Sequence, residues 1–226
     1  MMNIIITGAG RGIGFELVKK LSSNFDNKIY AVSRNLDRIE KLGASNVMHK
    51  SIDFSDETLD EKLGMLIEEI EEVDVIINNA GFLVNQPFEK LSKEDLLRSY
   101  EVNVFGPFRL IQAALPKLKK GSHVVNISSM GGFQGSAKFP GLSAYSSSKA
   151  AIANLTELLA EELKEKEIAV NCLALGAVQT EMLEEAFPGY QAPTSPAEMA
   201  KFIADFAING SKYFNGKILP VSLSTP

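Results

Sequence analysis

The stretch Thr7-Gly8-Ala9-Gly10-Arg11-Gly12-Ile13-Gly14 decides the fold, because it joins an apolar run at residues 4–6 to an amphipathic segment that starts at residue 15. Glycines at such a turn let the backbone approach a pyrophosphate and direct a helix N-terminus toward it. The spacing does not fit G-x-G-x-x-G, since Ile13 stands three residues after Gly10. It fits T-G-x-x-x-G-x-G, with Gly8, Gly12 and Gly14 in register. The turn therefore predicts a dinucleotide site, although plain packing of a strand on a helix uses similar turns.

Outside this turn, short apolar runs alternate with longer amphipathic segments. The runs of strand length cover residues 4–6, 29–32, 47–52, 73–77, 124–127, 168–173 and 218–221. The amphipathic segments cover residues 15–25, 36–42, 59–70, 93–118, 144–166 and 196–208. This alternation predicts an α/β fold, a Rossmann-type doubly wound parallel sheet of about seven strands with helices on both faces. No Pro-, Gly- or Ser-rich linker divides residues 1–226, so we expect a single domain.

Composition narrows the class of protein and its partners. Hydrophobic residues make up 45% and charged residues 23% of the chain, as in an ordinary globular protein. The net charge of -5 argues against a nucleic-acid or membrane surface, since phosphates favour clustered Lys and Arg. The N-terminal apolar run is too short for a signal peptide, and the single cysteine, Cys172, cannot form an internal disulfide, so we expect a cytoplasmic protein. His49 and His123 lack ligand spacing, so we expect no metal site.

The stretch Ala31-Val32-Ser33-Arg34-Asn35, at the end of the second predicted strand, bears on the choice of cofactor. An acidic residue at this place hydrogen-bonds the adenosine ribose, whereas an arginine accommodates a 2'-phosphate. The first carboxylate after the strand is Asp37, while Arg34 and Arg11 supply positive charge. Because guanidinium groups bind phosphate strongly, the sequence predicts NADP(H) over NAD(H). For either arginine alone, a plain surface position is the alternative.

Tyr145 and Lys149 stand four residues apart in the segment 144–166, which places both on one face of a helix. A neighbouring ammonium favours the phenolate and lowers the tyrosine pKa from about 10. Such a tyrosine serves as general acid in reduction and as general base in oxidation. Helix-face pairs are often structural, but two predicted strands end nearby in polar residues, Ser128-Ser129 and Asn78-Asn79-Ala80-Gly81. A hydroxyl at a strand end can hold a substrate oxygen while hydride arrives.

Five motifs follow one another over almost the whole chain: the glycine turn, the Asn-Asn-Ala-Gly stretch, Asn103, Ser129, and the pair Tyr145 and Lys149. In these motifs and their order, the sequence resembles the short-chain dehydrogenase/reductase family. The resemblance implies that Tyr145 is the acid/base, that Lys149 lowers its pKa and holds the nicotinamide ribose, and that Ser129 positions the carbonyl. It implies that Asn103 supports a water-linked proton relay behind Lys149.

The same resemblance assigns the cofactor contacts. It implies that Asp53 contacts adenine and that Thr180 contacts the carboxamide. Together with the residues of the turn and of the second strand end, the expected cofactor-binding residues are Gly8, Arg11, Gly12, Ile13, Gly14, Ser33, Arg34, Asp53, Asn79, Ala80, Gly81, Tyr145, Lys149 and Thr180.

Two features depart from the family pattern. The run between Ser129 and Tyr145 is a few residues longer than usual, which predicts a reshaped substrate wall. Leu175-Gly176 stands where the family has Pro-Gly. The region 175–196 is irregular and its part from residue 181 is short for the family, so we expect a small lid, in which Phe187 and Tyr190 either contact substrate or anchor the loop.

We expect a reductase of ketones or aldehydes that acts on a small molecule, because NADPH pools usually serve reduction. Reduction of a 3-oxoacyl thioester is a narrower reading, but it requires a basic patch for an acidic carrier protein, which the acidic composition does not visibly supply. A dinucleotide-binding scaffold or redox sensor without turnover is the alternative, and the intact Ser129, Tyr145 and Lys149 speak against it.

The segments 93–118 and 144–166 carry apolar residues over a wide arc, which core packing explains in part. By the family resemblance, these two helices pair across a two-fold axis. We therefore expect a homodimer or homotetramer.

Overall fold

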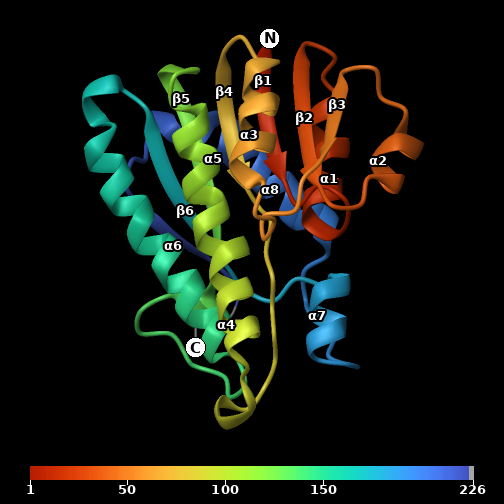
Figure 1. The fold of residues 1–226 in the computed structure, drawn as a ribbon, viewed down its shortest axis with the longest axis vertical. Coiled ribbons are helices and arrows are strands. Elements are labelled where there is room, and N and C mark those ends of the chain that lie inside the picture. Colours follow the sequence, from red (N-terminus) through yellow and green to blue (C-terminus); the bar gives the residue numbers. More distant parts are fainter. Residues whose placement is uncertain (224–226) are drawn as a thin grey trace.

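The computed structural model describes residues 1–223 and contains one sheet of seven strands (Figure 1). The strands are β1 (Met2–Thr7), β2 (Asn27–Ser33), β3 (Val47–Ser51), β4 (Val73–Asn78), β5 (Leu118–Ser129), β6 (Ala169–Leu175) and β7 (Ile218–Val221). They lie in the order β3-β2-β1-β4-β5-β6-β7, and neighbouring strands are parallel throughout. The predicted Rossmann-type parallel sheet is confirmed.

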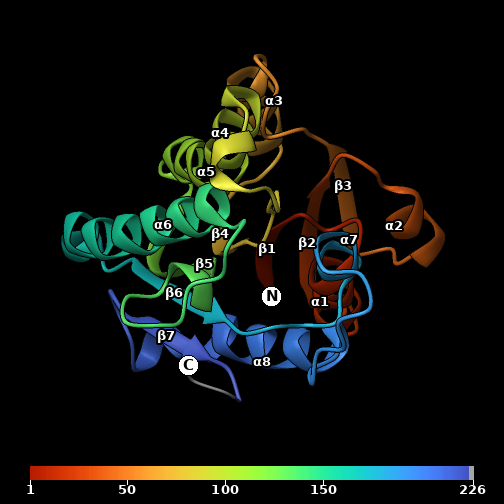
Figure 2. The same cartoon turned by 90° about the horizontal axis from the view of Figure 1, so that it is seen from below.

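Helices cover both faces of this sheet (Figure 2). They are α1 (Gly12–Ser22), α2 (Asp37–Leu42), α3 (Leu59–Glu68), α4 (Lys93–Tyr100), α5 (Gly106–Ala114), α6 (Ser143–Glu162), α7 (Glu181–Ala186) and α8 (Pro196–Asn209). Ile4 and Ile6 of β1 belong to the core that includes α1 and α8, whereas Ile5 belongs to the core that includes α3, α5 and α6. Burial on both faces explains why the strands read as continuous apolar runs.

The segment 93–118, expected as one helical stretch, is divided in the structure. α4 is followed by a π-helical turn (Glu101–Phe105), then by α5, and Leu118 already belongs to β5. Pro107 explains the break, because it has no amide hydrogen to donate to the carbonyl of Asn103 in a continuous α-helix. The buried Asn103 thus sits in a wide turn rather than in a regular helix.

The region 175–196, expected to be irregular, contains the short helix α7. Its first residue is Glu181, and the Thr180 hydroxyl before it accepts a hydrogen bond from the Leu183 amide at 3.2 Å. Threonine at this position and glutamates in the first turn are ordinary helix-start signals.

The strand order reverses between β1 and β4, since the chain passes from β1 outward to β3 and then returns to the other side of β1. In open α/β sheets, ligands bind at the carboxyl ends of the strands near such a reversal. β1 ends at Thr7, β4 at Asn78 and β5 at Ser129, so polar residues distant in sequence meet at one edge. Within residues 1–223, no helix has the length and apolar character needed to cross a membrane.

Candidate active site

A cavity of about 490 Å³ runs along the carboxyl ends of β1 to β6. Most of the predicted site residues line it, namely Gly8, Arg11, Gly12, Ile13, Ser33, Arg34, Asp53, Asn79, Ala80, Gly81, Ser129, Tyr145, Lys149 and Thr180. Gly14 and Asn103 lie behind this lining and act through its members, as described below.

The glycine turn and the end of β4 are pressed against each other. Gly8 has a φ of 66°, and a Cβ placed on it would lie 2.7 Å from the Cα of Ala80. The Thr7 hydroxyl accepts hydrogen bonds from the amides of Asn79 and Ala80 at 3.1 and 3.0 Å, and the Asn79 side chain donates to the Thr7 carbonyl at 3.0 Å. A Cβ on Gly14 would lie 2.1 Å from the Gly8 carbonyl oxygen, so Gly14 serves the packing of α1 under the turn.

The start of α1 suits an anion. Its N-cap residue, Arg11, makes no side-chain capping bond, and its first turn contains no acidic residue. Gly12 has a φ of 53°, and a Cβ there would project into the cavity toward Thr180, 3.3 Å from its methyl carbon. A diphosphate held by this cradle would meet free amide donors and the positive end of the helix dipole. The residues present therefore fit a dinucleotide.

Arg34, Asp53 and Ser33 border the cavity at the ends of β2 and β3. The guanidinium of Arg34 lies 3.8 Å from the Asp53 carboxylate. Burial alone would raise the pKa of Asp53, but two hydrogen bonds from Ser55 and the charges of Arg34 and Arg98 outweigh it, so the pKa is lowered. This side of the cavity therefore keeps one carboxylate ionised between two arginines.

Arg98 was not predicted from the sequence. It lies on α4, lines the cavity and stacks over the ring of Phe82, with its guanidinium carbon 4.7 Å from the ring centroid. Its Nε is buried and has no hydrogen-bond partner among the described residues. A charged residue on an amphipathic helix reads as solvated surface, so the sequence carries no signal that separates Arg98 from its neighbours.

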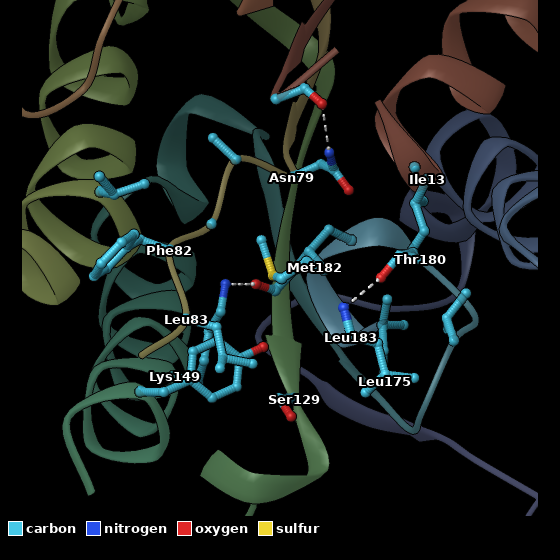
Figure 3. A pocket seen from close by; sticks show the side chains of 18 of the residues that line it. Ile13, Asn79, Phe82, Leu83, Ser129, Lys149, Leu175, Thr180, Met182 and Leu183 are labelled. Atoms are coloured by element: carbon cyan, nitrogen blue, oxygen red, sulfur yellow. Dashed lines mark hydrogen bonds between the residues drawn. The ribbon is translucent and has the colours of Figure 1, made fainter. Parts of the chain in front are cut away.

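Ser129, Tyr145 and Lys149 converge on the same cavity from β5 and α6. Figure 3 shows Ser129 and Lys149 in this cavity. The Ser129 side chain neighbours the Tyr145 phenol, and the ammonium of Lys149 lies 5.8 Å from the centroid of the Tyr145 ring. Ser129 also accepts a hydrogen bond from the Gly131 amide at 3.2 Å. The side chain of the neighbouring Ser128 donates instead to the Lys149 carbonyl at 2.6 Å, away from the tyrosine.

The expected lowering of the Tyr145 pKa is absent from this arrangement. Burial raises the pKa of Tyr145, and the hydrogen bond with Ser129 opposes the rise only in part. Lys149 donates its hydrogen bond to the Ile127 carbonyl, at 2.9 Å, rather than to the phenol. Burial also lowers the pKa of Lys149 to about 8. The tyrosine thus remains protonated, as a general acid requires.

Asn103 is fixed by three hydrogen bonds beside this group. Its carbonyl oxygen accepts from the Phe82 amide at 2.8 Å, and its amide donates to the Phe82 carbonyl and to the Ser148 hydroxyl, both at 2.9 Å. A Cβ on Gly81 would lie 3.6 Å from both the Asn103 side-chain oxygen and the Lys149 ammonium. Asn103 therefore anchors the loop after β4 next to Lys149.

A family model described as short chain dehydrogenase matches residues 2–191. The chain belongs to the short-chain dehydrogenase/reductase family. Among curated relatives, the 7alpha-hydroxysteroid dehydrogenase of Escherichia coli strain K12 is 34% identical over 80% of this chain and 72% of the relative. The 3-oxoacyl acyl-carrier-protein reductase FabG of Chlamydia trachomatis is 27% identical over 96% of this chain and 94% of the relative.

A solved structure supports the same assignment. A double mutant of a Serratia marcescens short-chain dehydrogenase/reductase is 26% identical, with a TM-score of 0.85 over 98% of this chain and 96% of that chain. Members of this family are oxidoreductases, and this short-chain dehydrogenase is therefore an oxidoreductase.

In this short-chain dehydrogenase, residues 181–190 form a lid over the cavity. Two ion pairs connect the lid to the cofactor end: Arg11 contacts Glu185, with one N···O distance of 3.1 Å, and Arg38 contacts Glu181 at 2.8 Å. At its other end, the Asn85 side chain donates to the Ala186 carbonyl at 2.9 Å. Arg11, which was expected to bind phosphate, thus forms an ion pair with the lid residue Glu185. Arg34, the other arginine expected to bind phosphate, pairs with Asp53 instead of the lid.

The longer run between Ser129 and Tyr145 forms a wall of the cavity. Met130, Phe139 and Leu142 of this run line it, together with Phe187 and Tyr190 from the lid. The backbone amide of Gln86 donates a hydrogen bond to the Gly141 carbonyl at 3.0 Å. This bond connects the wall to the loop after β4. Leu175, at the position where the family has proline, ends β6 and also lines the cavity.

The histidines and the cysteine lie outside the cavity lining. His123 is buried between Ala207 and Asn171, at 2.9 and 3.0 Å, and burial lowers its pKa to about 4. Burial raises the pKa of the Cys172 thiol to about 12. Across residues 1–223, no group of three or more His, Cys, Asp or Glu side chains is arranged to hold a metal ion.

Proposed function

We propose that the protein is an NADP(H)-dependent reductase that converts a ketone, an aldehyde or a 3-oxoacyl carbonyl to an alcohol. The observation that carries this proposal is the meeting of Ser129, Tyr145 and Lys149 in the cavity bordered by Gly8 and Gly12. Neither the glycine turn nor the helix-face pair is specific alone, but hydride transfer needs both at one place.

A nicotinamide held between the glycine turn and Lys149 would supply a hydride for the carbonyl carbon. Tyr145 donates its hydroxyl proton to the carbonyl oxygen, so the product carries one hydride and one proton more than the substrate. The raised pKa of Tyr145 keeps it protonated before the step, which favours reduction. Ser129 holds the carbonyl oxygen, and the ammonium of Lys149 stabilises the phenolate left behind. Asn103, beside Lys149, supports return of a proton from water.

The preference for NADP(H) rests on Arg34. Its guanidinium lines the cavity, and its neighbour Ser33 ends β2. The next carboxylate, Asp37, begins α2 and does not line the cavity. A 2'-phosphate at this end would meet an arginine, whereas a ribose hydroxyl would find no carboxylate from β2.

We further propose one catalytic domain, in the cytoplasm, that assembles as a homodimer or homotetramer. Exposed apolar residues on α4, the π-helical turn, α5 and α6 support the assembly, namely Leu96, Leu97, Phe105, Phe108 and Leu158. Apolar side chains gathered on adjacent helices are typical of subunit contacts.

A second candidate is a redox sensor that binds the dinucleotide without turnover. One assay separates the two: purified protein is mixed with NADPH or NADH and a panel of ketones, aldehydes and quinones, and oxidation of the reduced nicotinamide is followed. Tyr145→Phe should lower kcat by about a thousandfold and keep cofactor binding, because it removes only the acidic proton. Tyr213→Phe, at an exposed tyrosine outside the cavity, is the matched control. Equal rates for wild type and Tyr145→Phe would support the sensor.

A further inference from the structure

Apart from Lys149, the charged side chains that line the cavity lie together on one side. Arg34 and Asp53 follow β2 and β3, and Arg98 acts on Asp53 from α4. The Glu181 carboxylate belongs with them, because it pairs with Arg38 and would lie 3.5 Å from a Cβ on Gly12. We call this the cofactor side, at the ends of β1, β2 and β3.

The opposite side, formed by the residues after β5 and β6 and by the lid, is apolar. We call it the substrate side. Its wall includes Met130, Leu142, Met182, Leu183 and Phe187, and Leu83 reaches it from the loop after β4. Figure 3 shows Leu83, Met182 and Leu183 around Lys149 and Ser129. Among the described residues that line this side, Lys149 is the one charged side chain.

The polar groups of the substrate side are committed to protein partners. Lys149 donates to the Ile127 carbonyl at 2.9 Å, and Ser128 donates to the Lys149 carbonyl at 2.6 Å. Ser129 accepts a hydrogen bond from the Gly131 amide and neighbours the Tyr145 phenol. Among the described residues, the hydroxyls of Ser129 and Tyr145 are the ones placed beside Lys149 to meet the reacting oxygen, and Tyr190 of the lid is a further neutral polar side chain at the cavity. A charged group on the substrate would find no counter-ion among these neutral side chains.

Among residues 1–223, the rim of the substrate side presents no unpaired cation that could bind an anionic group of the substrate. Lys138 stands next to Phe139, but its ammonium points back at its own loop, 2.6 Å from the Phe133 carbonyl and 2.7 Å from the Ser136 hydroxyl. The lid carries Glu184 and Glu185. Neither glutamate lines the cavity, and Glu185 is already paired with Arg11, so this arginine is not free to bind a phosphate of coenzyme A or an acidic carrier protein.

We infer that, if the protein is the carbonyl reductase proposed above, its substrate is a neutral, predominantly apolar carbonyl compound. Burial of apolar surface against Met182, Leu142 and Phe187 supplies its binding free energy. A carboxylate or phosphate on the substrate would lose its hydration without gaining a counter-ion, which is strongly unfavourable. Keto acids, sugar phosphates and thioesters of coenzyme A or a carrier protein are therefore excluded, although one relative is named as a reductase of the last kind.

Matched substrate pairs test this inference with the intact protein. Acetophenone is compared with 4-acetylbenzoate, ethyl acetoacetate with acetoacetate, and acetoacetyl-N-acetylcysteamine with acetoacetyl coenzyme A. We expect kcat/KM to be at least about a hundredfold higher for the neutral member of each pair, because a site discriminates strongly against an unpaired buried charge. Equal or higher values for the charged members would overturn the inference and leave the proposed reductase standing.

Two further measurements keep this test separate from the proposed function. Calorimetric titration of acetophenone and 4-acetylbenzoate into protein saturated with NADP+ reports binding without turnover, so binding of the neutral ketone alone supports the inference even if no carbonyl is reduced. Tighter binding of the carboxylate contradicts it. Phe139→Arg places a cation at an exposed position of the wall and should narrow the kcat/KM ratio of this pair at least about tenfold. Phe25→Arg, exposed and outside the cavity, should leave the ratio unchanged.

Discussion

The cofactor side and the substrate side of one cavity are built in different ways. On the cofactor side, strand ends and glycine backbone hold the groups in place, as where the Thr7 hydroxyl binds the amides of Asn79 and Ala80. On the substrate side, loops and the lid carry the wall, and Phe139 and Tyr190 remain about half exposed. A site that serves one invariant ligand can be made of rigid elements, whereas a site that sets specificity lies on segments free to vary.

The largest expected effect on the cofactor side is a change of preference between NADPH and NADH. Arg34→Asp replaces a cation on the cofactor side by a carboxylate next to Asp53. We expect the ratio of kcat/KM for NADPH to that for NADH to fall about a hundredfold, because a charge-assisted contact with the 2'-phosphate is lost and repulsion replaces it. The measurement is initial rates with each cofactor at a fixed carbonyl concentration.

The control for this variant is Lys20→Glu, which makes the same change of charge on an exposed part of α1 away from the cavity. Its cofactor ratio should equal that of the wild type. An unchanged ratio in Arg34→Asp would show that Arg34 is a surface residue, and the NADP(H) preference would then have to come from Arg11 released by Glu185.

A smaller effect is expected from a substitution that disturbs the close packing of the glycine turn on the cofactor side. Gly14→Ala places a methyl group 2.1 Å from the Gly8 carbonyl and 2.6 Å from the Asn79 amide, so the turn must move. We expect the free energy of unfolding to fall by about 2 kcal/mol, as for other overpacked sites, with weaker cofactor binding. Chemical denaturation followed by circular dichroism gives the first quantity.

Gly64→Ala is the matched control, because Gly64 is also helical but has nothing within 4 Å of the added Cβ. It should raise the free energy of unfolding by about 0.5–1 kcal/mol through helix propensity alone. If both substitutions stabilise the protein, the turn is less tightly packed than the geometry indicates.

The difference between the cofactor side and the substrate side also determines which parts of the structure can be predicted from the sequence. Buried strands are apolar on both faces, so short apolar runs such as 4–6 and 73–77 predict the positions of β1 and β4 in the sequence. Their polar ends, Thr7 and Asn79 among them, are adjacent in space because parallel strands align their carboxyl ends. The cofactor side is therefore largely predictable from short motifs.

The rest depends on contacts between distant segments. The approach of Glu185 to Arg11 and of Asn85 to Ala186 arises from loop paths that no periodicity encodes. The raised pKa of Tyr145 also escapes the sequence, because a helix spacing of four shows that Lys149 is near but not that its ammonium turns toward Ile127. Helix α7 is an exception, since Thr180 is a recognisable N-cap.

The smallest effect tests Lys149, the one charged side chain among the described residues that line the substrate side. Burial lowers the pKa of Lys149 to about 8 from 10.5, so holding its ammonium in the fold costs about 3 kcal/mol near neutral pH. Lys149→Met removes that cost but also the hydrogen bond to the Ile127 carbonyl, and the unpaired carbonyl offsets part of the gain. We expect the variant to be inactive yet more stable than the wild type by about 1 kcal/mol at pH 7.

The pH dependence gives this prediction its sign. Below pH 8 the ammonium is charged in both the folded and the unfolded chain, and the folded wild type bears the full penalty. Between pH 8 and 10.5 the folded state loses the proton first, so the penalty fades and the wild type gains stability relative to Lys149→Met. Denaturant titrations at both ends of this window, with Lys20→Met as the exposed control, should show the advantage of the variant shrinking or reversing. If Lys149→Met is less stable than the wild type at every pH, Lys149 stabilises the fold as well as serving the chemistry. The buried ammonium would then cost the folded state less free energy than the apolar lining of the substrate side indicates.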